Sequence, residues 1–260
     1  MSRVLVTGAA SGLGDALATA LEARGDDVLR TDRSYPADPA ASDRQLHLDI
    51  TSEDDWSRAR EWVESTWGGL DVLINNAGVA GGGRLDLAEI EEWRWILDIN
   101  LLGAVRGLRT FVPMFKAQGS GRIVNVASLA GLVHPAGMGS YNAVKAAMVA
   151  LTETAGHELA AHGVTAHAVC PSYFRTNLMD SLQGADTGLA ATMRHLVERA
   201  PLGAEEIATA VLEGLDRGEE LIVPDDAARA AVALKHADRD RKSTRLNSSH
   251  TDISRMPSSA

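Results

Sequence analysis

Short apolar runs alternate with longer amphipathic stretches along most of the chain. An apolar run of about four to eight residues that ends at turn residues is typical of a buried strand, whereas apolar residues three or four positions apart indicate a helix. On this pattern we predict seven strands, at residues 3–7, 26–32, 45–51, 70–76, 121–128, 163–172 and 220–224. We predict helices at residues 15–25, 51–66, 89–118, about 141–162 and 202–218, and a helical flap at 179–200.

The regular alternation of strand and helix predicts an α/β fold, in which one parallel sheet is covered by helices on both faces. No internal repeat or linker interrupts the pattern, so we expect a single domain over residues 1–224. Residues 225–242 are charged and Ala-rich and are expected to form a C-terminal helical extension. Residues 243–260 contain six Ser and show no periodicity; we expect a disordered tail or a translated adapter stretch, and exclude them from the fold.

The composition and net charge of the chain restrict the kinds of partner that it can bind. The 260 residues are 45% hydrophobic, enough for a substantial core, and carry a net charge of −10. This acidity argues against nucleic acid and anionic membranes as partners. The single cysteine, Cys170, excludes an internal disulfide, the apolar start is too short for a signal peptide, and no run approaches the roughly 20 apolar residues of a membrane span. We therefore expect a cytoplasmic protein, and we expect no metal site.

A glycine-rich turn follows the first predicted strand. The segment TGAASGLG places Gly8, Gly12 and Gly14 between that strand and a helix. In this context a tight turn at Gly8, and close backbone approach at Gly12 and Gly14, let a pyrophosphate sit at the helix N-terminus. The spacing differs from the G-x-G-x-x-G fingerprint, so a plain strand–helix turn remains an alternative.

Two carboxylates follow the next strands. Asp32 ends the second strand, about 20 residues past the glycines, where a carboxylate suits a ribose diol and repels a 2′-phosphate. This favours NAD over NADP, although the neighbouring Arg33 is either a solvated surface charge or a group that softens the preference. Asp49 ends the third strand and is interpreted equally well as a contact to the adenine or as part of the start of the next helix, capped by Thr51 or Ser52.

Asparagines mark two further positions. Asn75 and Asn76 end the fourth strand, where their side chains can satisfy backbone groups and fix neighbouring strands. Asn100 falls in the middle of the long predicted helix, where Asn is unfavourable. It is either a tolerated polar residue or the sign of a local helix distortion with a function.

Ser128, Tyr141 and Lys145 are the strongest candidates for catalysis. Tyr141 and Lys145 are four residues apart at the start of a predicted helix, so their side chains share one face. A phenol has an ordinary pKa of about 10, and a cation beside it favours phenolate and lowers that pKa. Ser128 ends the fifth strand, where its hydroxyl can hold a substrate oxygen against the phenol. The set is suited to moving a proton on or off an alcohol, although a surface Tyr and a solvated Lys can share a helix by chance.

With TGAASGLG, Asp32, NNAG, Asn100, Ser128 and YNAVK in this order, residues 3 to 223 resemble the short-chain dehydrogenase/reductase family. The resemblance implies a Rossmann-type, doubly wound parallel sheet of about seven strands. It implies Tyr141 as general acid/base, Lys145 as the residue that lowers its pKa and holds the nicotinamide ribose, and Ser128 as the residue that positions the substrate oxygen. Asn100 would complete a water relay through Lys145.

The resemblance also implies a nicotinamide cofactor, NAD or alternatively NADP, and a homo-oligomer, tetramer or dimer, that packs through the helices carrying Asn100 and Tyr141. Besides Tyr141 and Lys145, the residues expected to line the cofactor are Gly8, Ser11, Gly12, Leu13, Gly14, Asp32, Asp49, Ile50, Asn76, Ala77, Gly78, Pro171, Phe174 and Thr176.

Two positions depart from the family pattern. Ser172 stands where the family has Gly, and Phe174 stands where it has a small aliphatic residue, so Phe174 is expected to crowd or stack near the nicotinamide.

The flap and the loop 79–85 are mostly small or apolar, which indicates a moderately hydrophobic alcohol or ketone as substrate.

The leading hypothesis is therefore an oxidoreductase that interconverts a secondary alcohol and a ketone. A non-catalytic NAD-binding sensor of the same fold is the alternative, although a sensor need not keep Ser128, Tyr141 and Lys145 together. Epimerase or dehydratase relatives carry a longer C-terminal substrate domain than the roughly 35 residues that follow the last strand here.

Overall fold

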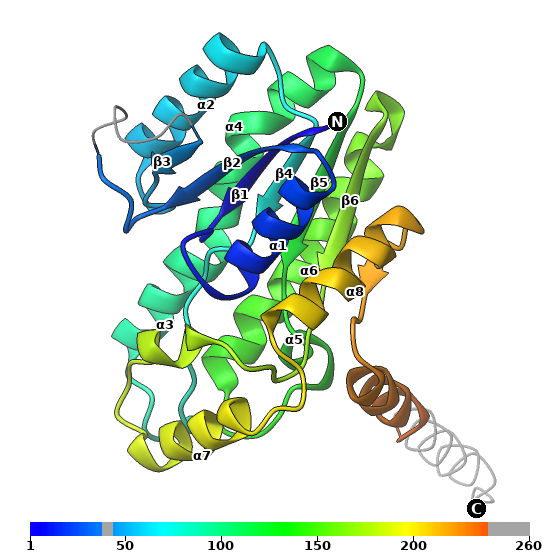
Figure 1. Cartoon of the computed structure of the whole chain (residues 1–260). Helices are drawn as coiled ribbons and strands as arrows, with labels where there is room; N and C mark the ends of the chain where they lie inside the picture. The colour runs from blue at the N-terminus through cyan, green and yellow to red at the C-terminus, as the bar shows by residue number, and fades with distance from the viewer. Residues whose placement is uncertain (38–43, 239–260) are drawn as a thin grey trace, which may run out of the picture.

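A computed structural model describes residues 1–37 and 44–238 (Figure 1). Its strands are β1 (Arg3–Thr7), β2 (Asp27–Asp32), β3 (Gln45–His47), β4 (Val72–Asn75), β5 (Gly121–Val126), β6 (Val164–Val169) and β7 (Leu221–Ile222). Its α-helices are α1 (Gly12–Ala23), α2 (Glu53–Trp67), α3 (Ile90–Leu97), α4 (Gly103–Gln118), α5 (Ala130–Val133), α6 (Gly139–Leu159), α7 (Thr187–Glu198) and α8 (Ala204–Asp216). Three shorter turns are η2, a π-helix (Asp98–Leu102), and the 3-10 helices η3 (Ala160–His162) and η4 (Asn177–Ser181).

All seven strands form one parallel sheet in the order β3-β2-β1-β4-β5-β6-β7. The chain therefore builds outward from β1 to β3 and then returns to build outward from β4 in the other direction. Such a reversal opens a crevice at the carboxyl ends of the strands, where α/β sheets bind ligands. The predicted α/β fold with one doubly wound parallel sheet is confirmed.

Alternating residues of the central strands enter two separate core layers. Val4 and Val6 of β1 belong to a layer with α1 and α8, whereas Leu5 between them belongs to a layer with α2, α4 and α6. Figure 1 shows these helix groups on opposite faces of the sheet. Both layers exclude water from the strands, so the central strands are apolar on both sides, as expected of a parallel sheet.

The structure differs from the sequence prediction at element ends. Strand β3 stops at His47 rather than at residue 51, because Asp49 begins the turn that leads into α2. Ser52, not Thr51, is the N-cap of α2, and its hydroxyl accepts a hydrogen bond from the backbone N–H of Asp55 at 3.2 Å. The predicted helix over residues 89–118 is divided by the π-helical turn η2, and α5 was not predicted.

The C-terminal segment beyond β7 is helical over residues 226–238. The rest of the expected extension (239–242), the expected tail (243–260) and part of the expected loop at 36–42 lie outside the described residues. No helix within the described ranges combines the length and the apolar character needed to cross a membrane.

Close packing of α1 on β1 depends on Gly14. A Cβ at this position would lie 2.1 Å from the carbonyl oxygen of Gly8 and 2.5 Å from Nδ2 of Asn76. The missing side chain therefore brings the start of α1 directly over the end of the first strand.

We expect Gly14→Ala to lower the free energy of unfolding by about 1–3 kcal/mol, because the methyl group overpacks a backbone contact. Gly156→Ala is the matched control: it lies inside α6, and the nearest atom to its added Cβ is Ala166 Cβ at 3.8 Å. This control should be neutral, or stabilising by up to about 1 kcal/mol, from helix propensity. Urea denaturation of both variants measures the difference, and equal stability of the two would refute the packing argument.

Candidate active site

The predicted site residues gather at the carboxyl ends of β1, β2, β4, β5 and β6. Gly8 follows β1, Asp32 ends β2 and Asn76 follows β4. Ser128 lies two residues beyond β5, and Pro171 lies two residues beyond β6. The topology thus brings segments more than 150 residues apart in sequence to one edge of the sheet.

The glycine turn between β1 and α1 has the geometry of a cradle for an anion. Gly8 and Gly12 have φ of 68° and 57°, values that L side chains rarely adopt. A Cβ on Gly12 would lie 2.9 Å from Thr176 Oγ1, and one on Gly8 would lie 2.8 Å from Ala77 Cα. Ser11 is the N-cap of α1 but makes no side-chain capping bond, so the first backbone N–H groups of this 12-residue helix are available. These features fit a pyrophosphate at the helix N-terminus.

Asp32 is held beside this turn. Its Oδ2 accepts a hydrogen bond from the N–H of Ala10 at 3.3 Å, and its Oδ1 accepts one from the N–H of Ser34 at 2.9 Å. Tyr35, which was not singled out from the sequence, donates its phenol O–H to the carbonyl of Ala9 at 3.1 Å. The segment after β2 is therefore tied to the glycine turn, and an aromatic residue soon after the strand-ending Asp is the feature that would have drawn attention to Tyr35.

Asp49 serves the turn before α2. Its Oδ1 accepts hydrogen bonds from the N–H and the hydroxyl of Thr51, at 2.9 and 2.7 Å. This geometry favours the local structural interpretation of the carboxylate, and contact with an adenine stays a prediction. The neighbouring Ile50 is buried, and a Cβ on Gly103 would lie 2.5 Å from Ile50 Cδ1, so Ile50 also packs the start of α4.

Asn76 joins the ends of β1 and β4. Its Nδ2 donates to the carbonyls of Thr7 at 2.9 Å and of Gly8 at 3.3 Å. In return, Thr7 Oγ1 accepts from the backbone N–H groups of Asn76 and Ala77, both at 3.0 Å. The expectation that this asparagine satisfies backbone groups and fixes neighbouring strands agrees with these contacts.

Asn100 lies in the π-helical turn η2. Of the two interpretations of this residue, the local helix distortion is therefore present. The buried side chain accepts from the N–H of Val79 at 2.8 Å and donates to the carbonyl of Val79 at 2.9 Å. It therefore pins the segment that follows β4 and Gly78. A wider turn at this point exposes backbone groups that a regular helix would use, and π-turns are frequent at functional sites. The water relay through Lys145 stays a prediction.

Ser128, Tyr141 and Lys145 converge as predicted from their spacing. Tyr141 lies in the first turn of α6, is buried, and is hydrogen bonded to Ser128. Lys145 lies one turn further on; its Nζ donates to the carbonyl of Val126 at 2.9 Å and lies 5.7 Å from the centroid of the Tyr141 ring. Ser128 also accepts a hydrogen bond from the N–H of Ala130 at 3.1 Å, which orients its hydroxyl.

The pKa of Tyr141 differs from the expectation that the Lys145 ammonium lowers it. Burial raises the pKa of Tyr141 to about 12, and the hydrogen bond from Ser128 only partly opposes it. Burial also lowers the pKa of Lys145 to about 8, because the ammonium has left water. Desolvation is therefore the largest influence on the pKa of Tyr141 in this structure. Tyr141 is a protonated phenol at neutral pH, a state suited to donating a proton.

The segment after β6 lies beside the Ser128 segment and the glycine turn. The carbonyl of Pro171 accepts a hydrogen bond from the N–H of Leu129, which ties it to the Ser128 segment at 2.9 Å. Thr176 is the N-cap of η4, with its hydroxyl accepting from the N–H of Leu178 at 3.3 Å. Phe174 is buried in the core layer that also contains Leu13 and the residues of α8. Its ring is thus accommodated by the core, and this placement favours packing over stacking on a nicotinamide.

Residues of the flap belong to an apolar cluster that also contains Tyr141. Met179 of η4 and Met193 of α7 are both 4% exposed and belong to one cluster with Met138 and Tyr141. Methionine side chains are unbranched and adaptable, so this cluster can accommodate varied apolar groups.

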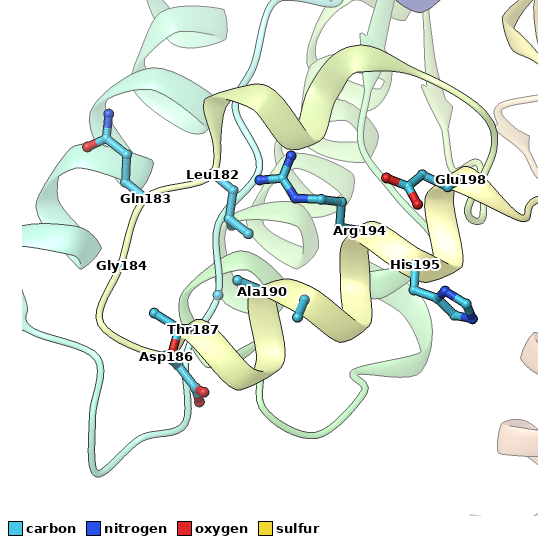
Figure 2. A pocket seen from close by; sticks show the side chains of 11 residues that line it. Leu182, Gln183, Gly184, Asp186, Thr187, Ala190, Arg194, His195 and Glu198 are labelled. Atoms are coloured by element: carbon cyan, nitrogen blue, oxygen red, sulfur yellow. The ribbon is translucent and has the colours of Figure 1, made fainter.

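A cavity of about 530 Å³ lies on the flap itself (Figure 2). Figure 2 shows Leu182, Asp186, Ala190 and Arg194 around it, from α7 and the segment before α7. Neither Ser128 nor Tyr141 lines this cavity, so its position does not mark the reacting centre. Among the described residues no group of three metal-ligating side chains gathers.

Comparison with known proteins agrees with this geometry. A family model described as short chain dehydrogenase matches residues 2–186. A 3-alpha-(or 20-beta)-hydroxysteroid dehydrogenase of Mycobacterium tuberculosis is 34% identical over 182 residues, which cover 68% of this chain and 70% of that protein. A 3-oxoacyl-(acyl-carrier-protein) reductase of Escherichia coli is 30% identical over 213 residues, which cover 80% of this chain and 86% of that protein.

Solved structures give the same result. A short-chain dehydrogenase/reductase of Burkholderia phymatum in complex with NAD has a TM-score of 0.84 at 28% identity, covering 93% of this chain and 95% of that one. A short chain dehydrogenase of Burkholderia cenocepacia in complex with NADP has a TM-score of 0.75 at 28% identity, covering 94% and 97%. The sheet order, the glycine turn and the matched family model lead to one conclusion: the chain belongs to the short-chain dehydrogenase/reductase family of oxidoreductases.

Proposed function

We propose that this protein is a nicotinamide-dependent oxidoreductase that interconverts a secondary alcohol and a ketone, with Tyr141 exchanging the hydroxyl proton. The observation that carries the proposal is the convergence of Ser128, Tyr141 and Lys145 from two separate segments beside the glycine cradle. A merely structural tyrosine would not need a serine hydroxyl beside it and an ammonium one turn away on the same helix.

Each of the site residues has a distinct role in the proposed reaction. Ser128 positions the substrate oxygen, and Tyr141 gives or takes the proton at that oxygen. Lys145 holds positive charge next to the phenol and is available to a ribose hydroxyl. The glycine turn holds the pyrophosphate of the cofactor, and Asp32 the adenosine ribose. The bound nicotinamide supplies or accepts the hydride.

The substrate proposed here is a moderately hydrophobic alcohol or ketone. The support is the apolar cluster of Met138, Met179 and Met193 around Tyr141. The names of the relatives point to different substrates, a hydroxysteroid and an acyl carrier-bound oxoacyl group, and therefore do not select one.

The cofactor proposed is NAD rather than NADP, because the Asp32 carboxylate stands where a 2′-phosphate would be repelled. A homo-oligomer, tetramer or dimer, formed through α4 and α6 is part of the same proposal, and the partly exposed Leu97 and Leu102 lie just before α4. The cytoplasmic location expected from the single cysteine stays a prediction.

Tyr141→Phe tests the proton transfer. It should lower kcat by about 10²–10⁴-fold, because the ring remains but the proton carrier is lost. Binding of NADH, measured by fluorescence titration, should persist. Tyr173→Phe is the matched control, since Tyr173 is 39% exposed and, within the described part of the chain, its hydroxyl bonds only to Met138 Sδ, at 3.6 Å. The assay is a panel of secondary alcohols and ketones followed at the nicotinamide absorbance band, and undiminished turnover by Tyr141→Phe would overturn the mechanism.

The raised pKa of Tyr141 predicts opposite pH profiles for the two directions. The phenol donates the proton in ketone reduction, and with a pKa of about 12 that form is fully present across neutral pH. Reduction should therefore keep a level kcat/KM between about pH 6 and pH 8. Alcohol oxidation needs the phenolate, which increases about tenfold per pH unit below the pKa, so its kcat/KM should rise across the same range. A level profile for oxidation would contradict the assignment of the base.

Asp32→Asn tests the cofactor preference. Removing the charge while keeping the shape should raise KM for NAD and lower KM for NADP, moving the ratio of their kcat/KM values by about tenfold or more. Asp27→Asn, at the opposite end of β2, is the control and should leave the ratio unchanged. If wild type already prefers NADP, the role assigned to Asp32 is wrong.

A further inference from the structure

The helix at residues 226–238 is attached to the rest of the protein at its first turn and through Lys235. It follows β7 and lies toward the end where α5 and α7 are found (Figure 1). Ala228, in its first turn, is 0% exposed, so the start of the helix is packed into the protein rather than extending from it. Two of the side chains at this helix contact segments that carry the proposed catalytic residues.

Asp225 connects the start of this helix to the segment after β6. The carboxylate is 6% exposed, and its Oδ1 accepts a hydrogen bond from the N–H of Ala228 at 2.7 Å, which caps the helix. Its Oδ2 accepts one from the N–H of Ser172 at 3.2 Å. One buried carboxylate therefore holds both segments, and neither bond can be replaced by water without opening the contact.

The connection continues to the proposed catalytic serine. Pro171, next to Ser172, accepts the hydrogen bond from Leu129 at 2.9 Å. Leu129 follows Ser128, whose hydroxyl in turn accepts from Ala130 at 3.1 Å. A shift of the Ser172 segment therefore reaches the backbone that directly follows the serine.

Lys235 forms a second, independent connection further along the helix. Its Nζ donates to the carbonyl of Leu132 at 2.5 Å and to Nδ1 of His134. His134 Nε2 lies 3.0 Å from the carbonyl of Gly131, so this bonding pattern places the ring proton on Nε2 and leaves Nδ1 to accept. The ammonium thus holds the C-terminal end of α5.

The contact with Lys235 supports an unusual backbone conformation at His134. Within residues 1–37 and 44–238 it is the one non-glycine residue with positive φ, at 56°. Such a backbone persists only where its surroundings over-determine it. The residues after it lead to Met138, whose backbone pairs with Gly83, and to Tyr141.

We propose that the helix at residues 226–238 is a positioning element of the active site: Asp225 fixes the backbone around Ser128, and Lys235 fixes the His134 turn that leads to Tyr141. The proposal rests on the proposed function for its effect on turnover, but its effect on the backbone is independent of any substrate. Asp225 and Lys235 act as positioning residues, because they contact the segments and not the reacting groups.

Asp225→Asn and Lys235→Met test the two connections. Asparagine caps a helix as well as aspartate does, but its single oxygen accepts only one of the two N–H groups. Lys235→Met keeps the length of the side chain and removes the donor, and Lys235→Arg restores donors and charge. Asp226→Asn is the matched control, since Asp226 is exposed and, among the described residues, its side chain pairs only with Arg229 on the same helix.

Hydrogen–deuterium exchange of the full chain gives the readout that does not depend on activity. Peptides covering residues 128–138 should exchange at least about fivefold faster in both test variants, since local opening follows the loss of these bonds. Peptides of β2 should not change, Lys235→Arg should restore protection, and Asp226→Asn should match wild type. Unchanged exchange over 128–138, or an equal change in the Asp226→Asn control, would overturn the proposal.

Kinetics give the second readout. Misplacement of Ser128 should lower kcat of Asp225→Asn by about tenfold, whereas displacement of the His134 turn in Lys235→Met should mainly raise KM for the alcohol, by about fivefold. Wild-type kinetics in both variants, with wild type active, would overturn the link to catalysis. If wild type turns over no alcohol or ketone, the proposed function fails, and the exchange data still decide whether the helix holds these loops.

Discussion

The hydrogen bond from Lys145 to the carbonyl of Val126 is the interaction on which the site depends. It brings a charged group into an apolar layer, where 6% of the residue remains exposed and burial lowers its pKa to about 8. A buried ammonium is tolerated only where it finds an acceptor. The acceptor here is the last residue of β5, so the bond fixes the start of α6, and with it Tyr141, against the strand that leads to Ser128.

Glycines let the surrounding backbones come close enough for this arrangement. A Cβ on Gly131 would lie 2.6 Å from the backbone of Lys145, so α5 rests directly on α6. Gly14 allows the same approach of α1 to the end of β1. At both places main chain packs directly on main chain, without an intervening side chain. The flap adds Met179 and Met193 to the cluster around Tyr141, and methionine side chains adapt to varied apolar neighbours.

Polar side chains inside the molecule hold together the ends of the elements. Asn76 joins β1 to β4, Asn100 pins the segment after β4, and Asp225 joins the C-terminal helix to the segment after β6. Each of these side chains is buried or part-buried and is hydrogen bonded to backbone atoms of another segment. Such contacts are specific because an unpaired buried group is costly, so each one selects a single relative placement of two segments.

Hydrophobic periodicity predicts the alternation of strands and helices and the parallel sheet, and the four-residue spacing places Tyr141 and Lys145 on one helical face, because both are local properties. The glycine turn, Asp32 and Ser128 could be expected beside them from the order of motifs that the chain shares with its family. Other features depend on contacts between distant segments. The raised pKa of Tyr141 is an effect of burial, the π-turn at Asn100 is fixed by its bonds to Val79, and the αL conformation of His134 occurs beside a lysine 101 residues away. Each of these features depends on which distant groups come into contact and on how completely water is excluded from them. The spacing of residues along the chain specifies neither.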